Sequence, residues 1–367
     1  MSRKSDSYNR LRLKPDEVEL IKEYRAKSLD NFNDNTSLDL HLKERGIKKE
    51  DVVSVKHWQN MKGELRFSIV TKEDKGIGQN SILENISKFI SEHAPVYPNI
   101  KRIKGQHLLV INPADIHIGK YASSKETGEE YNNDIAVKRV IDGVNGILAM
   151  ASGFKVDRVL FCIGNDVLHI DNVYNTTTKG THQDTDGKWW EHFEVALQLY
   201  VKCVEMLREV APVDCVHSMS NHDYQSGFHL AHALSSWFRK CDDVSVDASV
   251  SHRKYYQYGN NLIGLEHGDG AKMDNLPLIM AQERSEQWAE SKYRYWYLHH
   301  IHHKVKHKWR DAKDYIGITV EYLRSPSGSD SWHHRKGYIS TPAVEGFIHD
   351  LDKALSLIHI SEPTRPY

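Results

Sequence analysis

The chain has 367 residues, of which 39% are hydrophobic and 27% charged, and its formal net charge is -1. This composition is typical of a globular protein with a sizeable core. It excludes a molecule that binds polyanions through overall positive charge, so any polyanion site must be local or built on bound cations. No apolar run reaches the roughly 18 residues that suggest a membrane span. The first residues also lack an apolar signal core, which predicts a cytoplasmic protein with no membrane partner.

Cysteine and histidine usage indicates the kind of chemistry to look for. The four cysteines are scattered and form no C-x-x-C pair, which favours reduced thiols. The 23 histidines are the unusual feature of the composition. Because histidine is the commonest metal ligand, their placement along the chain is informative.

Residues 1–72 predict a small α+β unit. A charged helix is expected over about 15–28, and two strands are expected over 51–58 and 65–72. The following segment, 73–104, is charged and broken by glycines and prolines, and it predicts a connector.

Strands and helices alternate from residue 107 onward. The predicted strands cover 107–112, 157–163, 213–219, 261–267, 293–299 and 315–323. The predicted helices cover about 133–150, 189–210, 230–238 and 276–289. Such alternation predicts one layered α/β domain over residues 105–355.

The final segment has an unusual sequence. LSLIHISEPTRPY resembles the translation of sequencing-adapter DNA fused to a reading frame. We therefore expect residues 356–367 to be a non-native tail. The alternative is an ordinary disordered tail.

Five polar clusters directly follow predicted strands, where sites in open α/β sheets usually lie. They are Asp115-Ile116-His117, Gly164-Asn165-Asp166 with Val167-Leu168-His169, Asn221-His222-Asp223, His267-Gly268-Asp269, and the run from His299 to His303. A single Asp or His at a strand end is more often a hydrogen-bonded loop residue than a ligand. Five such clusters in this order form a far more specific pattern.

In this order the clusters resemble the calcineurin-like metallophosphoesterase superfamily, whose motifs run D-x-H, G-D, G-N-H-D, H and G-H-x-H. The resemblance covers about residues 106–303 and departs from the pattern at Asn165, Ser220 and His299. The D-V-L-H sequence is similar to the D-x-x-H of the DNA-repair exonuclease branch, and the overall organisation resembles phage-encoded members. The resemblance implies a layered sandwich of two mixed β-sheets flanked by helices, preceded by the small α+β unit.

The resemblance also implies two divalent metal ions that share one aspartate. The first would be held by Asp115, His117, Asp166 and His302, and the second by Asp166, Asn221, His267 and His300. The inserted residue leaves Asp171 as an alternative to Asp166. Mixed carboxylate, amide and imidazole ligands suit Mn²⁺, Fe²⁺ or Zn²⁺, and we expect Mn²⁺. Paired dications are typical of phosphoester hydrolysis.

Three further residues receive catalytic predictions from the same resemblance. His222 would protonate the leaving oxygen as general acid. Asp223 would either orient His222 through a hydrogen bond or be a surface residue. His169 would either contact a phosphate or be a loop histidine.

A polar insertion at 175–190 and a basic run at 304–310 bear on the substrate. Lys179, Trp189 and Trp190 could line a groove in which bases stack on aromatic rings. The alternative is that the two tryptophans open the next helix and pack against the core. The basic run would either collect phosphates or be a solvated strand edge.

The leading functional prediction is a metal-dependent nuclease that hydrolyses DNA phosphodiesters in the manner of a DNA exonuclease. A second hypothesis keeps the chemistry but takes nucleotides, phosphoproteins or small phosphomonoesters as substrates. A third hypothesis is an inactive scaffold of the same fold. DNA or another phosphoester is therefore the expected partner.

Overall fold

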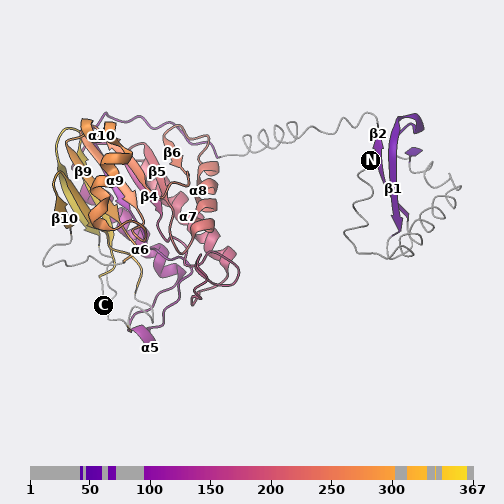
Figure 1. The fold of residues 1–367 in the computed structure, drawn as a ribbon, viewed down its shortest axis with the longest axis horizontal. Coiled ribbons are helices and arrows are strands. Elements are labelled where there is room, and N and C mark those ends of the chain that lie inside the picture. The colour runs from indigo at the N-terminus through magenta and orange to yellow at the C-terminus, as the bar shows by residue number, and fades with distance from the viewer. Residues whose placement is uncertain are drawn as a thin grey trace. The chain divides into compact units, whose positions relative to one another are not determined.

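The computed structural model describes residues 42–43, 47–59, 65–71, 95–301, 312–328, 335 and 341–361. The chain divides into two compact units, Met1–Phe89 and Ile90–Tyr367 (Figure 1). The first unit contains an antiparallel strand pair, β1 (Val52–Gln59) and β2 (Leu65–Thr71), after a short 3-10 turn. These are the two strands that the sequence predicts. The helix expected over 15–28 and most of the connector lie outside the described residues.

The second unit is built on a six-stranded sheet. Its strands, in spatial order, are β13 (Leu355–Ser361), β12 (Val344–Asp350), β3 (His107–Asn112), β4 (Val156–Gly164), β5 (Val213–Ser218) and β6 (Val244–Asp247). Strands β3, β4, β5 and β6 run parallel, whereas β12 is antiparallel to both of its neighbours, β3 and β13. The central strands are almost continuously apolar, as expected for parallel strands covered on both faces.

A second, five-stranded sheet faces the first. Its order is β10 (Ala312–Tyr315), β11 (Ile318–Tyr322), β9 (Tyr293–Leu298), β8 (Asn261–Glu266) and β7 (Lys254–Tyr258). Strands β11, β9 and β8 are parallel, and the two outer pairs are antiparallel. Both sheets are therefore mixed.

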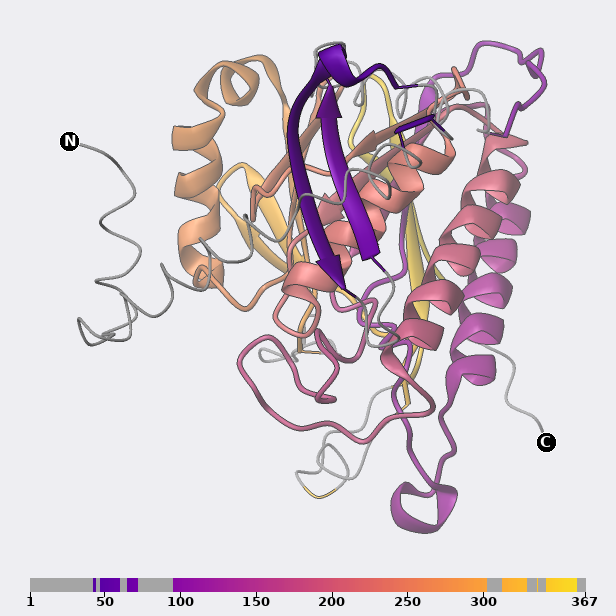
Figure 2. The ribbon, with the colours of Figure 1, turned by 90° about the vertical axis from the view of Figure 1, so that its right-hand side faces the viewer.

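Helices cover the outer face of each sheet. The six-stranded sheet carries α6 (Asn133–Ala151), α7 (Trp189–Arg208) and α8 (Tyr224–Trp237), which lie side by side (Figure 2). A four-residue helix, α5 (Ser124–Thr127), precedes them. The five-stranded sheet carries α9 (Leu276–Glu283) and α10 (Ser285–Glu290). Figure 1 shows helices on both sides of the strands.

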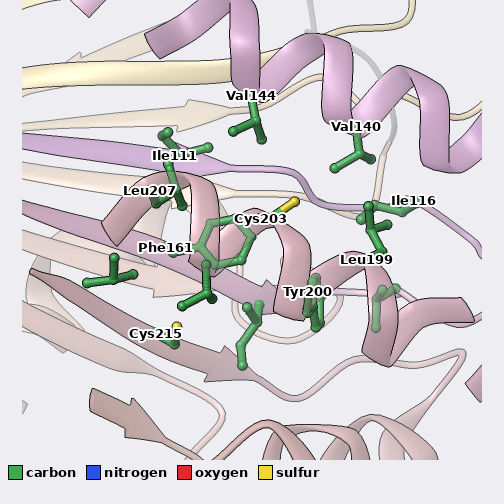
Figure 3. Packing of buried hydrophobic residues seen from close by; sticks show 14 of the residues in the cluster. Ile111, Ile116, Val140, Val144, Phe161, Leu199, Tyr200, Cys203, Leu207 and Cys215 are labelled. Atoms are coloured by element: carbon green, nitrogen blue, oxygen red, sulfur yellow. The ribbon is translucent and has the colours of Figure 1, made fainter. Parts of the chain in front are cut away.

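Apolar side chains fill the spaces between these layers. Between the six-stranded sheet and its helices, Ile111 and Phe161 pack with Val144, Tyr200 and Leu207 (Figure 3). A second cluster joins the two sheets through the following buried residues: Leu108, Val110, Leu160, Ile263, Leu265 and Tyr297. The layers thus follow the order helix, sheet, sheet, helix, which confirms the predicted α/β class with two mixed sheets.

Several elements differ from the sequence prediction. The helix expected over 276–289 breaks at Arg284, whose φ of -133° and ψ of 47° are not helical. The strand expected over 315–323 is a hairpin that turns at Gly317, which adopts a φ of 79°. Strands β6, β7 and β12 were not predicted. Residues from Leu355 pair with β12 as an edge strand, and their expected non-native origin stays a prediction.

Within the part of the chain that the structure describes, we find no helix with the length and apolarity that a membrane crossing requires.

Candidate metal centre

The polar clusters converge because the strands that precede them share a direction. β3, β4 and β5 are parallel in one sheet, and β8 and β9 are parallel in the other. Carboxyl ends of parallel strands meet at one edge of a sheet. Four of the converging side chains are almost completely buried: Asp115, His117, Asp166 and His267. Burial of so many ionisable groups requires charge pairing or a bound ion.

The backbone at these positions is strained. The φ angles of Asp115, His117, Asn165, Asp166 and His300 lie between 51° and 71°. This left-handed region is uncommon for residues other than glycine, although Asp, Asn and His enter it more often than most. Clusters of such angles are typical of functional sites, where surrounding contacts hold the strained conformation.

The first group of side chains consists of Asp115, His117 and Asp166, whose ligand atoms lie within 4.8 Å of one another. Oδ2 of Asp115 accepts a hydrogen bond from the backbone nitrogen of His300 at 3.0 Å. The Ser325 hydroxyl donates to the backbone oxygen of Asp115 at 2.5 Å. These are three of the four residues expected to hold the first metal. The fourth, His302, lies outside the described residues.

The second group consists of Asp166, His267 and His300, again within 4.8 Å. Nε2 of His267 lies 3.1 Å from Oδ2 of Asp166 and 2.9 Å from Oδ1 of Asn221. All four side chains expected to hold the second metal are therefore neighbours. Asp166 belongs to both groups, which is the position required of a bridging ligand.

A third group consists of His117, His169 and His222. The Nδ1 atoms of His117 and His169 are 3.2 Å apart. The backbone nitrogen of His222 donates to Oδ1 of Asp166 at 2.8 Å, and its ring Nδ1 lies 2.9 Å from the backbone oxygen of His169. Because a carbonyl oxygen only accepts, this contact assigns the hydrogen of His222 to Nδ1. His169 is 3% exposed and belongs to the centre itself.

Asp223 has a different role from the predicted one. Its Oδ1 accepts from the Ser220 hydroxyl at 2.5 Å, and its Oδ2 accepts from the backbone nitrogen of Leu168 at 2.9 Å. Ser220 also accepts from the backbone nitrogen of Asp166 at 2.8 Å. Asp223 is buried and braces the loop that carries Asp166, so the expected hydrogen bond to His222 and the surface position are both wrong.

Asp171, the alternative bridging ligand, caps a helix. Its Oδ1 accepts from the backbone nitrogens of Gln225 and Ser226 at 3.0 and 2.8 Å, at the start of α8. The Thr178 hydroxyl donates to its Oδ2 at 2.8 Å. These contacts occupy both carboxylate oxygens and favour Asp166 as the shared residue.

The polar insertion is anchored to helix α6. Oδ2 of Asp186 accepts from the backbone nitrogen of Asn133 at 2.9 Å, so it anchors the insertion to the first turn of α6. Trp189 and Trp190 open α7 as expected, but their exposures of 49% and 48% show that they do not pack into the core. Lys179 is exposed. The predicted basic run at 304–310 lies outside the described residues.

Charges at the centre are strongly coupled. Burial disfavours the Asp166 carboxylate, but the charges and hydrogen bonds of His267 and His222 together outweigh burial and hold the pKa of Asp166 below its usual value. Burial likewise opposes the charged form of His267, but Asp166 raises the pKa of His267 to about 9. Burial, opposed in part by His267, raises the pKa of Asp115 to about 8. The positive charge of His267 alone is therefore too small to balance the carboxylates of Asp115 and Asp166.

The side chains fit a divalent cation. Oδ2 of Asp166 is buried, and its close neighbour Nε2 of His267, at 3.1 Å, also contacts Oδ1 of Asn221 at 2.9 Å. A buried carboxylate oxygen with one shared donor is costly, and a cation would satisfy it. Carboxylate, imidazole and amide donors together suit Mn²⁺, Fe²⁺ or Zn²⁺. The histidine and aspartate clusters could thus hold metal ions.

Two supporting residues escaped the sequence prediction. In the sequence Ser220 is only a departure from a family motif, yet its hydroxyl links Asp166 to Asp223. Ser325 follows a strand far along the chain and supports Asp115. No pattern in the sequence identifies either residue, because each acts through a long-range contact.

The fold and the site define an α/β protein of two facing mixed sheets with a histidine–aspartate centre at their strand ends. No protein-family model matches the chain, and no curated protein matches it in sequence. Among solved structures, one similar chain is a Vps29 double mutant from Entamoeba histolytica. It is 11% identical, with an alignment covering 70% of this chain and 99% of that one, and its TM-score is 0.26.

Proposed function

We propose that this chain is a two-metal phosphoesterase of the calcineurin-like type, and that its substrates are DNA phosphodiesters. The observation that carries the proposal is the position of Asp166, which is shared by two groups of ligand-type side chains. A shared carboxylate is what keeps two dications close together in two-metal sites. The order of the five sequence clusters supports the same class.

The metal sites are assigned to this chain's own side chains. Asp115, His117 and Asp166 would hold one ion, with His302 as the expected fourth ligand. Asp166, Asn221, His267 and His300 would hold the other. When bound, two such ions supply Lewis-acid stabilisation of phosphate oxygens and lower the pKa of water.

His222 and His169 complete the proposed catalytic arrangement. His222 has its Nδ1 directed to the backbone oxygen of His169, which leaves Nε2 for proton transfer to the leaving oxygen. His169 is held against His117 and would contact a phosphate bound at the centre. Ser220 and Asp223 keep the Asp166 loop in place.

DNA is favoured as substrate by local features rather than by overall charge. The net charge of -1 provides no long-range attraction to a polyanion. The exposed Trp189 and Trp190 can stack on unpaired bases, and Lys179 can contact a phosphate. Few phosphate contacts imply a shallow salt dependence, since each contributes about 0.7 to 0.9 to the log–log slope.

A substrate panel tests the proposal. Purified protein with Mn²⁺ should cleave labelled single-stranded or end-exposed DNA and act little on closed circular duplex. His169→Ala should lose activity on DNA and lose less on bis(p-nitrophenyl) phosphate. If only nucleoside monophosphates or phosphopeptides are hydrolysed, the enzyme is a phosphatase. If the protein binds no metal and hydrolyses nothing, the scaffold hypothesis replaces the proposal.

A further inference from the structure

The polar insertion begins as a short antiparallel hairpin. Thr176 pairs with His182, and the backbone nitrogen of Gln183 donates to the backbone oxygen of Asn175 at 2.9 Å. The hairpin is therefore held by its own backbone hydrogen bonds. Its two legs contact different loops of the candidate metal centre.

The first leg contacts the loop that carries Asn221 and His222. The backbone nitrogen of Thr178 donates to the backbone oxygen of Asn221 at 3.3 Å, and the Thr178 hydroxyl accepts from the backbone nitrogen of Tyr224 at 3.2 Å. The same hydroxyl donates to Oδ2 of Asp171 at 2.8 Å. This leg is thus fixed to the loop of the second proposed metal site.

The second leg contacts the loop that carries His117. Thr185 pairs with Lys120 in an antiparallel bridge, and the backbone nitrogen of Asp186 donates to the backbone oxygen of Gly119 at 2.8 Å. Gly119 follows His117 by two residues, so this leg reaches the loop of the first proposed metal site. The insertion therefore connects the loops of both sites.

Asn133, the first residue of α6, joins the second leg to Gly119. Its Oδ1 accepts from the backbone nitrogen of Gly119 at 2.7 Å, and its Nδ2 donates to the backbone oxygen of Asp186 at 3.0 Å. Because one partner only donates and the other only accepts, these contacts fix the orientation of the amide. His192 packs against the same glycine, since a Cβ there would lie 2.5 Å from its Nδ1. Gly119 is thus held through its nitrogen, its oxygen and its contact with His192.

The backbone conformation at His117 depends on such contacts. Its φ is 51°, and that of Gly119 is 98°. Strained backbone of this kind persists only where the surrounding structure holds it. The nitrogen of His117 donates to the backbone oxygen of Asp166 at 3.0 Å, which holds the loop at its start. Asn133 supplies the contact at its end, so the loss of that side chain would release His117 from one side.

We propose that Asn133 is a positioning residue for the first metal site, acting through Gly119 on His117, and that the insertion braces the loops of the two sites against each other. The inference rests on the proposed two-metal function. Asn133 is not itself a ligand, because its amide is engaged by Gly119 and Asp186. Outer contacts that orient metal ligands typically change metal affinity by about 10–100-fold when they are removed.

A Mn²⁺ titration of the metal-free protein tests this without catalysis, with free Mn²⁺ measured by electron paramagnetic resonance. The wild type should bind two ions. Asn133→Ala should bind one ion about 10–100-fold more weakly and the other within twofold of the wild type. His117→Ala identifies the affected site, because adding Asn133→Ala to it should weaken the remaining ion less than twofold.

A second variant keeps the test decisive if Asn133→Ala does not fold. Asp186→Ala removes the carboxylate oxygen that accepts from the backbone nitrogen of Asn133, and it changes only the insertion. It should weaken the same ion at least about threefold. Unchanged affinity for both ions in this variant and in Asn133→Ala would overturn the inference.

The neighbouring asparagine provides the matched control. The side chain of Asn132 caps α6 by accepting from the backbone nitrogen of Ile135 at 3.0 Å. Asn132→Ala should therefore lower the urea midpoint of unfolding but keep both ion affinities within twofold of the wild type. Equal weakening of one ion in Asn132→Ala and Asn133→Ala would mean that only the stability of α6 matters, which overturns the positioning role.

The same titration separates this inference from the proposed function. Two ions held equally tightly by the wild type and Asn133→Ala would contradict the positioning role and leave the two-metal proposal intact. Fewer than two ions in the wild type would contradict the proposed function, and the inference would fail with it.

Discussion

Asp166 lies 3.1 Å from Nε2 of His267 and 2.8 Å from the backbone nitrogen of His222. It belongs to two of the three ligand groups, and it is the carboxylate that those two groups share. Asp166→Ala should therefore remove most bound metal and all activity, while circular dichroism shows a preserved fold. Elemental analysis of the purified variant measures this. The control Asp184→Ala changes an exposed carboxylate of the insertion and should keep both ions. Two ions per chain in Asp166→Ala would disprove the bridging assignment.

His222 differs from the ligands because it is assigned to proton transfer. His222→Ala should keep both metals and lose roughly 10²–10⁴-fold in rate. The loss should be smaller for substrates with a good leaving group such as nitrophenolate, which needs little protonation. Metal content and rates on two esters of different leaving-group pKa provide the measurement. An equal loss on both esters would rule out the general-acid role.

Single residues show where prediction from sequence reaches its limit. The described metal ligands could be selected from the sequence because each directly follows an apolar strand. They are Asp115, His117, Asp166, Asn221, His267 and His300. Asp223 could be selected but not given its correct role, since its partners Ser220 and Leu168 depend on how two loops meet. The strained backbone of Asp115 and Asp166 is likewise set by tertiary contacts, not by local sequence.

Helix α8 depends on a cap from a distant segment. Its own N-cap residue, Asp223, makes no side-chain cap, and Asp171 supplies the acceptor for Gln225 and Ser226. Asp171→Ala should lower the free energy of unfolding by about 1–2 kcal/mol, the usual effect of losing a helix cap. Urea denaturation measures the change. Asp171→Asn keeps an acceptor oxygen and should lose less, and equal losses in the two variants would contradict the capping role.

Strand β12 buries a histidine between the sheets. Nε2 of His349 lies 3.0 Å from the Tyr297 hydroxyl, and burial lowers the pKa of His349 to about 3. Its unfolded value is about 6.5, so below that pH the unfolded chain binds a proton that the folded protein refuses. The contribution of neutral His349 to the free energy of unfolding is thus fully present above pH 6.5 and is lost as the pH falls toward 3.

The variant His349→Phe removes this ionisation. Its loss of unfolding free energy between pH 7 and pH 5 should be smaller than that of the wild type by about 2 kcal/mol. Urea denaturation at both pH values, with a chelator present, provides the comparison. Identical pH dependence in the two proteins would show that His349 ionises equally in the folded and unfolded states.

Whole elements were predictable where their pattern is local. A run of apolar residues identifies each of the strands β3, β4, β5, β8 and β9. Strand β12 cannot be identified in this way, because its sequence VEGFIHD does not alternate polar and apolar residues, and the strand is buried along its full length. The break between α9 and α10 at Arg284 is also invisible in a continuous helical composition. These features are decided by packing against other layers.

The arrangement of the molecule as a whole explains why the centre could be anticipated at all. The clusters lie far apart in the sequence, but the strands before them are parallel within each sheet, so their carboxyl ends meet. The division of those strands between two facing sheets was implied only by the family resemblance.

The two compact units separate the candidate centre from the N-terminal part of the chain. Every described residue assigned to metal binding or proton transfer belongs to the unit Ile90–Tyr367, which contains both large sheets and the main cores. A unit with its own core is expected to fold alone.

Residues 90–367 expressed without the first unit should therefore bind the same number of metal ions and hydrolyse bis(p-nitrophenyl) phosphate within twofold of the full chain. A DNA-binding measurement on both proteins gives the second readout, because a loss confined to DNA would assign substrate binding to residues 1–89. Loss of metal or of cooperative unfolding in the shorter protein would show that the second unit needs the first to fold.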